Sequence, residues 1–199
     1  MILPVIAYGD PVLRKIGEEI TKDYPGLQDT IANMFETMHN ALGVGLAAPQ
    51  IGKSIRLFVI ETKPFTEREE NDEDEDEFSP EEREQLANFR KVFINAKVIE
   101  EEGKEWVFNE GCLSIPKIRE DVLRKPKIHI QYYDENFNFF DETYEGLAAR
   151  VIQHEFDHIE GKLFTDRISP LRRRLLQGKL TDISKGKVKI GYKMRFPSR

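Results

Sequence analysis

The feature that most constrains this chain is a segment with a helical hydrophobic pattern that is bounded by two glycines. Residues 146–161 read GLAARVIQHEFDHIEG, and the apolar residues recur every three to four positions, as on one face of an α-helix. His154 and His158 then lie one turn apart on the same side of that helix. Two neutral imidazoles in this arrangement can bind one metal ion, so the sequence predicts a helix that carries part of a metal site.

Glu155 adds a chemical function to this helix. It follows His154 directly, about 100° around the helix axis, where a carboxylate can reach a water molecule on the metal and act as general base. The alternative is an amphipathic helix that contains two histidines by chance. Because the chain has only 4 histidines, and average composition gives such a match on the order of once in a few hundred chains, the pattern favours the metal site.

Two histidines leave a metal site incomplete, since metal centres in proteins normally have three or four protein ligands. Cys112 is the only cysteine, and it stands in the segment EGCLS, where Gly111 lets the backbone turn and come close to a ligand. A single cysteine is by itself more typical of a small buried hydrophobic residue. The incomplete histidine pair makes Cys112 the expected third ligand.

A third segment, GVGLAAPQ at 43–50, joins a predicted helix to a predicted strand. No lysine follows the glycines, so the segment is not a phosphate-binding P-loop. It is either a plain connection or a backbone edge that a peptide can approach, with the Gln50 amide directed at a developing oxyanion. The amide of Leu113 is the candidate for a second oxyanion donor.

The fold class follows from the order of the predicted elements. The chain has 199 residues, of which 39% are hydrophobic and 33% charged, as expected for one soluble globular domain. The hydrophobic patterns predict helices at 27–42, 146–161 and 170–177, and strands at 56–61, 92–98, 106–108, 127–133 and 139–144. Gly178, Gly186 and Gly191 are expected to interrupt the tail. Without regular βαβ alternation, this order predicts an α+β fold.

Charge is strongly segregated along the chain. Residues 67–90 contain 12 acidic and 3 basic side chains, and residues 171–199 contain 10 basic and 1 acidic. The acidic stretch is expected to be a solvated, mobile loop insertion. The basic tail either aids solubility or binds polyanions. No apolar run approaches the ~18 residues of a membrane span and no signal peptide is evident, so a cytoplasmic protein is predicted.

The segments GVGLAAPQ, EGCLS and QHEFDH, in this order, resemble the three signature motifs of the peptide deformylase family. The resemblance extends from about Ile2 to Ile168. It implies an α+β fold in which antiparallel β-sheets pack around the central helix that carries HEFDH. It also implies a catalytic domain at 1–168, with the acidic insertion at about 64–90, followed by a basic C-terminal extension at 169–199.

The family's activity implies the roles of individual residues. Members remove the formyl group from the N-terminal formyl-methionine of newly synthesised polypeptides and release formate. The resemblance implies that the metal ligands are Cys112, His154 and His158, that Glu155 is the general acid and base, and that Gln50 and the Leu113 amide stabilise the oxyanion. The implied ion is Fe²⁺, with Zn, Ni or Co possible in the purified protein.

The resemblance implies some further contacts less directly. Val44, Gly45 and residues 118–119, which are Ile118 and Arg119, would flank the peptide, and Glu110 would pair with Arg124. Arg150 is a departure, because some family members have an apolar residue there, near the methionine pocket. The expected partners are formyl-methionyl nascent peptides and, through the basic tail, a weak ribosome contact, with no membrane and no sequence-specific nucleic-acid binding.

Two other functions stay open on the sequence. A zinc metallopeptidase shares the H-E-x-x-H pattern but usually completes its site with Glu or His. A non-enzymatic binding protein with a structural metal would need a fourth protein ligand, and no second cysteine exists to supply it. Hydrolysis of formyl-methionyl peptides against internal cleavage of peptides would separate the two enzymes.

Overall fold

The computed structural model describes residues 1–67 and 78–197 and confirms the α+β class. The helices are α1 (Leu27–Asn40), α2 (Pro80–Asn88), α3 (Gly146–Ile159) and α4 (Pro170–Ser184). The strands are β1 (Val5–Ile6), β2 (Gly45–Ala47), β3 (Leu57–Glu61), β4 (Arg90–Glu102), β5 (Trp106–Cys112), β6 (Ile115–Arg124), β7 (Lys127–Tyr133), β8 (Phe139–Glu145) and β9 (Met194–Arg195). In these ranges no helix has the length and apolar character needed to cross a membrane.

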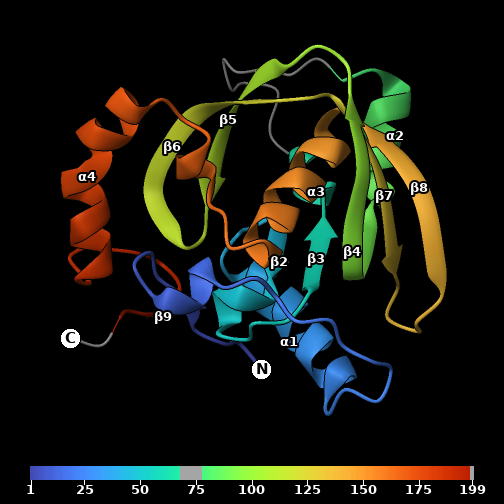
Figure 1. The fold of residues 1–199 in the computed structure, drawn as a ribbon, viewed down its shortest axis with the longest axis horizontal. Coiled ribbons are helices and arrows are strands. Elements are labelled where there is room, and N and C mark those ends of the chain that lie inside the picture. The colour runs from blue at the N-terminus through green and yellow to red at the C-terminus, as the bar shows by residue number, and fades with distance from the viewer. Residues whose placement is uncertain (68–77, 198–199) are drawn as a thin grey trace.

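The helix that carries the HEFDH motif lies in the middle of the molecule. A five-stranded antiparallel sheet with the order β2-β3-β4-β7-β8 packs on one side of α3, and the β5–β6 hairpin lies on its other side (Figure 1). α3 contacts β2, β3, β7 and β8. The motif is therefore enclosed between two sheets, as the family resemblance implied.

Strand β3 explains how the sheet carries a helix on each face. Successive side chains of a strand point to opposite faces, and the first four residues of β3 are all buried. Phe58 and Ile60 belong to the core shared with α3, whereas Leu57 and Val59 belong to the core shared with α1. A strand buried on both faces has a continuous apolar sequence, and residues 57–60, which read LFVI, match this pattern within the predicted strand 56–61.

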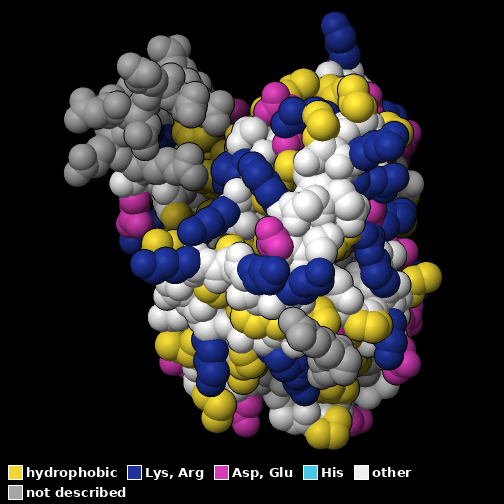
Figure 2. Space-filling model, turned by 90° about the vertical axis from the view of Figure 1, so that its left-hand side faces the viewer, with side chains coloured by type: hydrophobic (Ala, Val, Ile, Leu, Met, Phe, Trp, Pro, Cys, Tyr) yellow, Lys and Arg dark blue, Asp and Glu magenta, His cyan; other side chains and the backbone are white. Residues whose placement is uncertain are grey.

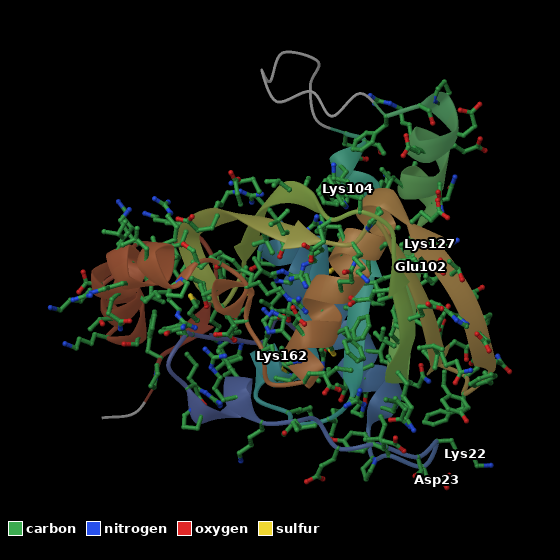
Figure 3. All side chains as sticks on the ribbon, turned by 45° about the horizontal axis from the view of Figure 1, so that its top comes forward. Lys22, Asp23, Glu102, Lys104, Lys127 and Lys162 are labelled. Atoms are coloured by element: carbon green, nitrogen blue, oxygen red, sulfur yellow. The ribbon has the colours of Figure 1, made fainter. Side chains whose placement is uncertain are left out.

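The β5–β6 hairpin was only partly predicted. The predicted strand 106–108 continues to Cys112, and β6 was missed altogether. β6 alternates between buried and exposed positions, but its sequence, IPKIREDVLR, includes five charged side chains that obscure the alternation. In the separate five-stranded sheet, Lys127 on β7 pairs with Glu102 on β4, and their side chains form an ion pair at 3.4 Å (Figure 3).

The acidic insertion is not an irregular loop throughout, and that prediction was wrong for residues 80–88. Ser79 caps helix α2, because its hydroxyl accepts a hydrogen bond from the Glu82 amide at 3.2 Å and its own amide donates to the Glu82 carboxylate at 3.1 Å. Leu86 is buried. The density of charge obscured this capping box. The most acidic part of the predicted loop, 68–77, lies outside the described residues.

The C-terminal helix is longer than the sequence predicted. It begins at Pro170, as expected, but it continues through Gly178 to Ser184. Leu176, Leu180 and Ile183 are buried in a core cluster that also contains Phe164, so packing outweighs the cost of about 1 kcal/mol for a glycine inside a helix. Lys and Arg side chains are spread over the face of the molecule that includes α4 (Figure 2).

Two leucines of α4 test whether this helix is part of the folded core. Leu180→Ala should lower the free energy of unfolding by about 2 to 5 kcal/mol, because it leaves a cavity at a fully buried position. Leu175→Ala on the same helix is the control, since Leu175 is 66% exposed, and it should change stability little. Urea denaturation of both variants measures the difference. Equal stabilities would show that α4 does not pack on the core.

Candidate metal centre and active site

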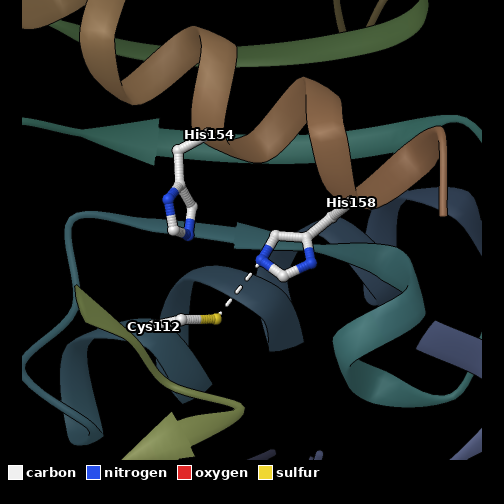
Figure 4. Close-up of side chains that lie close together, drawn as sticks. All are labelled: Cys112, His154 and His158. Atoms are coloured by element: carbon white, nitrogen blue, oxygen red, sulfur yellow. Dashed lines mark hydrogen bonds between the residues drawn. The ribbon is translucent and has the colours of Figure 1, made fainter. Parts of the chain in front are cut away.

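Three side chains, two from α3 and one from β5, lie close together between these elements. His154 and His158 project from α3, and Cys112 lies at the end of β5 (Figure 4). Their candidate ligand atoms all lie within 4.8 Å of one another. The Cys112 Sγ is 3.3 Å from the His158 Nε2. The structure thus brings Cys112 to the two histidines that the sequence selected, although it lies more than forty residues before them in the chain.

A bulge in the hairpin sets the position of Cys112. Gly111 pairs with Arg119, but Cys112 pairs with Ile115, so the register shifts between them. Lys117, in the shifted part of β6, has a φ of 62°, in the left-handed region that non-glycine residues rarely adopt. Bulges of this kind bend a strand and redirect its side chains. Here the bend places Cys112 at the turn, facing the histidines.

The three residues fit a divalent metal ion. Glu110 accepts a hydrogen bond from the His154 Nδ1 at 3.0 Å, which leaves the other ring nitrogen for the metal. Burial lowers the pKa of His158 to about 3, so this ring is neutral, as a ligand must be. A thiolate with two imidazoles suits transition metals. Among the described residues the cluster contains three candidate ligands, a set that would leave a coordination position open on a bound ion.

A buried ionic network holds the hairpin against α3. Arg124 of β6 donates to both Glu110 oxygens, at 2.7 and 2.9 Å, and to Asp157 of α3 at 2.7 Å. The exposed fractions of Arg124 and Glu110 are 2% and 4%. Although burial opposes its charge, hydrogen bonds from Arg124 and His154 hold the pKa of Glu110 well below its ordinary value. The pairing of Glu110 with Arg124 is the one that the resemblance implied.

Asp157 is a member of this network that the sequence analysis missed. Its carboxylate also accepts two hydrogen bonds from Arg167, both at 2.6 Å. Burial opposes its ionisation, but the hydrogen bond from Arg167 and the charge of Arg124 lower the pKa of Asp157. The motif H-E-x-x-H treats this position as variable, so the only signal was an acidic residue on the inward face of the helix.

Arg150, the departure from some family members, joins the same network. Its Nη1 donates to Glu110 at 3.0 Å and to the Val122 carbonyl at 3.1 Å, and its Nη2 donates to the Trp106 carbonyl at 2.8 Å. The guanidinium also lies 4.5 Å from the centre of the Trp106 ring. Its charge is therefore compensated where it lines the cavity described next.

A cavity of about 460 Å³ opens onto two of the three candidate ligands, Cys112 and His154, whereas His158 does not line it. Of the predicted site residues, those that line it are Val44, Gly45, Gln50, Glu110, Cys112, Leu113, Ile118, Arg119, His154 and Glu155. The tail contributes Lys189, Ile190, Gly191 and Tyr192, which the sequence analysis did not assign to the site. These tail residues carry no motif, and only the fold brings them to the cavity.

Gln50, in the short 3-10 helix Ala48–Ile51 that follows β2, and Glu155 of α3 lie beside the candidate metal site. The Gln50 Oε1 accepts a hydrogen bond from the Ala47 amide at 2.8 Å, so its Nε2 faces the Cys112 Sγ at 3.4 Å. Glu155 is buried, its Oε2 has no hydrogen-bond partner among the described residues, and burial raises its pKa to about 7. A Cβ on Gly45 would lie 2.3 Å from the Glu155 Oε1, so only glycine leaves room for this carboxylate.

The fold and the site define an α+β protein with a Cys-His-His metal site of the H-E-x-x-H type. The model of the polypeptide deformylase family matches residues 2–174. The peptide deformylase of Christiangramia forsetii is 59% identical over 198 residues, which cover 100% of this chain and 97% of that protein. The peptide deformylase of Flavobacterium johnsoniae is 58% identical over 196 residues, with coverages of 98% and 96%.

Solved structures agree with these sequence matches. The crystal structure of a peptide deformylase from Legionella pneumophila superposes with a TM-score of 0.75 and 36% identity, covering 94% of this chain and 98% of that chain. That of the peptide deformylase from Thermotoga maritima gives 0.70 and 38%, with coverages of 85% and 99%. The chain belongs to the peptide deformylase family, and the family resemblance that the sequence indicated is confirmed.

The buried network predicts a large stability difference between two arginine substitutions. Arg124→Met leaves Glu110 and Asp157 without their shared cation, and the loss of one partner from a buried ion pair typically costs about 3 to 5 kcal/mol. Arg172→Met is the control, because Arg172 also makes two hydrogen bonds to one carboxylate, that of Glu120, but its side chain is 56% exposed. Its effect should stay below about 1 kcal/mol. Urea unfolding that shows equal losses would contradict the structural role of the network.

Proposed function

We propose that this chain hydrolyses the formyl amide of N-formyl-methionyl peptides, which releases formate and a free N-terminal amine. The observation that carries the proposal is the Glu155 carboxylate, which is buried and has an oxygen without a hydrogen-bond partner among the described residues. It lies beside the Cys-His-His cluster and lines the same cavity as Gln50. A general base, oxyanion donors and a metal site in one cavity are what amide hydrolysis needs.

Each group in the site has a separate role in the proposed reaction. A divalent ion, when bound by Cys112, His154 and His158, would supply Lewis acidity and lower the pKa of a water molecule. Glu155 takes the proton of the attacking water and passes it to the leaving amine. The Gln50 Nε2 and the Leu113 amide donate hydrogen bonds to the oxyanion that develops on the formyl group.

The cavity walls also offer a place for the peptide. Val44 and Gly45 lie at β2, which is the edge strand of the five-stranded sheet. An edge strand presents unpaired backbone groups to which an extended peptide can pair. Ile118 and Arg119 line the cavity from the hairpin, and the Arg119 Nε is held by Asn109 at 2.8 Å. We infer that the peptide lies between these two walls.

The zinc metallopeptidase alternative is not favoured. The family model and the curated relatives match peptide deformylases over nearly the whole chain, and a cysteine completes the candidate ligand set in place of Glu or His. Release of formate from formyl-Met-Ala-Ser without internal cleavage of longer peptides supports the proposal. Internal cleavage without formate release would overturn it.

Glu155 gives the sharpest test of the catalytic roles. Glu155→Ala should reduce the rate of formate release by about 10² to 10⁴, the usual loss when general acid and base catalysis is removed. Metal content should stay near that of the wild type, because Glu155 is not a ligand in this proposal. Glu145→Ala is the control, since Glu145 precedes the same helix and is exposed. Near-normal turnover by Glu155→Ala would contradict the assignment.

The identity of the metal is a separate proposal. Zinc normally outcompetes ferrous iron at sites with nitrogen and sulfur ligands, but the family resemblance implies Fe²⁺. We expect anaerobically purified protein to contain iron and to lose formate release in air as the iron oxidises. Replacement by Ni or Co should give an air-stable enzyme. Full activity of the zinc form, unaffected by oxygen, would contradict iron as the native metal.

We also propose that the basic tail gives the chain a weak contact with the ribosome, where formyl-methionyl peptides emerge. Because this substrate is made on ribosomes in the cytoplasm, we also propose that the chain is cytoplasmic. Exposed cations of α4, among them Arg173, Arg174 and Lys179, support the contact, because cations bind the phosphates of RNA with release of counterions.

Charge reversal is the better test of the ribosome contact. Truncation of the tail would remove buried leucines of α4 that belong to the core, and the remaining chain could lose stability. Arg174→Glu with Lys179→Glu should reduce co-sedimentation with ribosomes at low salt and lower the slope of log K against log salt by about 1 to 2. Lys22→Glu with Lys104→Glu is the matched control at two exposed sites outside α4 (Figure 3). If both double variants co-sediment equally, the tail has no specific role in binding.

A further inference from the structure

The turn that follows Cys112 is held by three segments that are distant in the sequence. The Gln50 Nε2 donates to the Ser114 hydroxyl at 3.2 Å. The Tyr8 amide donates to the Ser114 carbonyl at 2.9 Å. The Tyr192 hydroxyl donates to the Leu113 carbonyl at 2.7 Å. Leu113 and Ser114 form a two-residue turn between paired strands. The three contacts restrain both carbonyl groups of this turn and the Ser114 side chain.

Tyr192 is itself held in place by the backbone next to it. The Val5 amide donates to the Lys193 carbonyl at 2.9 Å, and the Ala7 amide donates to the Arg195 carbonyl at 2.9 Å. These bonds belong to the parallel pairing of β1 with β9. The side chain of Tyr192 is partly buried and lines the cavity. A rigid attachment point therefore lies directly beside the hydroxyl that contacts the turn.

We propose that Tyr192 is a positioning residue for the hydrolysis reaction, because its hydroxyl holds the Leu113 carbonyl and thereby restrains the backbone torsions of Leu113, which in turn limit how far the Leu113 amide can rotate. This inference rests on the proposed function, in which that amide donates to the oxyanion. Oxyanion donors act only when they are already aligned with the place where charge develops. The tail then completes the catalytic cavity, although it lies about eighty residues beyond the turn in the sequence.

The role predicts an effect on kcat rather than on substrate binding. An oxyanion donor gains its strength in the transition state, and removal of one donor typically costs about 10² to 10³ in kcat. Tyr192→Phe keeps the ring and removes only the hydroxyl, so the Leu113 amide is displaced rather than lost. We expect kcat for formyl-Met-Ala-Ser to fall about 5- to 50-fold, with KM within about twofold of the wild type.

A matched tyrosine separates this role from a general loss of stability. Tyr132 on β7 is buried, and its hydroxyl, like that of Tyr192, donates a hydrogen bond, in this case to Glu142 at 2.6 Å, but it does not line the cavity. Tyr132→Phe should leave kcat and KM unchanged. A third variant, Tyr192→Leu, removes both ring and hydroxyl and should lower kcat at least as far as Tyr192→Phe.

The outcomes decide the inference separately from the proposed function. Formate release by the wild-type protein tests the function. A kcat loss confined to the two Tyr192 variants, with KM preserved, supports the positioning role. The role is overturned if Tyr192→Phe keeps full kcat, if only KM rises, or if Tyr132→Phe lowers kcat as much as Tyr192→Phe does.

Discussion

The paired hydrogen bonds between Glu110 and Arg124 are the interaction on which the metal site depends. Glu110 lies two residues before Cys112 and also accepts a hydrogen bond from His154, while Arg124 reaches Asp157 on the same helix. Charges this deeply buried are costly unless every partner is in place, so the hairpin and α3 have one favourable relative position. That position brings the thiol of β5 to the imidazoles of α3.

The two carboxylates of the site, Glu110 and Glu155, have different surroundings and therefore different pKa values. Glu110 is surrounded by Arg124, Arg150 and His154, and its pKa stays well below the ordinary value. Glu155 is buried beside Gly45, with one oxygen unpartnered among the described residues, and its pKa is raised. Opposite environments give acidic groups different tasks. In the proposed function, Glu110 therefore orients the candidate ligand His154, and Glu155 is left available for proton transfer.

The sequence predicted the parts of this site that depend on local spacing. The helical period around His154 and His158 and the turn at Cys112 are visible within a few residues. The segment GVGLAAPQ indicated Gln50 as a candidate oxyanion donor, and the family resemblance supplied Glu110. Local patterns do not reveal the contacts of Asp157 on α3, whose partner Arg124 comes from strand β6. They also do not reveal Tyr192, which reaches the turn only through the pairing of β1 with β9. β6 was missed because its charged side chains obscured the alternation of buried and exposed positions. α2 was missed because the surrounding charged residues obscured its N-terminal capping box.

The affinity of the site for its metal tests most directly whether the buried network assembles it. A chelator competition with Co²⁺ would compare the wild type with Glu110→Gln, and with Glu120→Gln, which alters a carboxylate that pairs with the exposed Arg172. Residues that orient a metal ligand typically contribute about 10- to 100-fold to affinity. The structure predicts a loss of that size for Glu110→Gln and little change for Glu120→Gln. Wild-type affinity in Glu110→Gln would contradict the account.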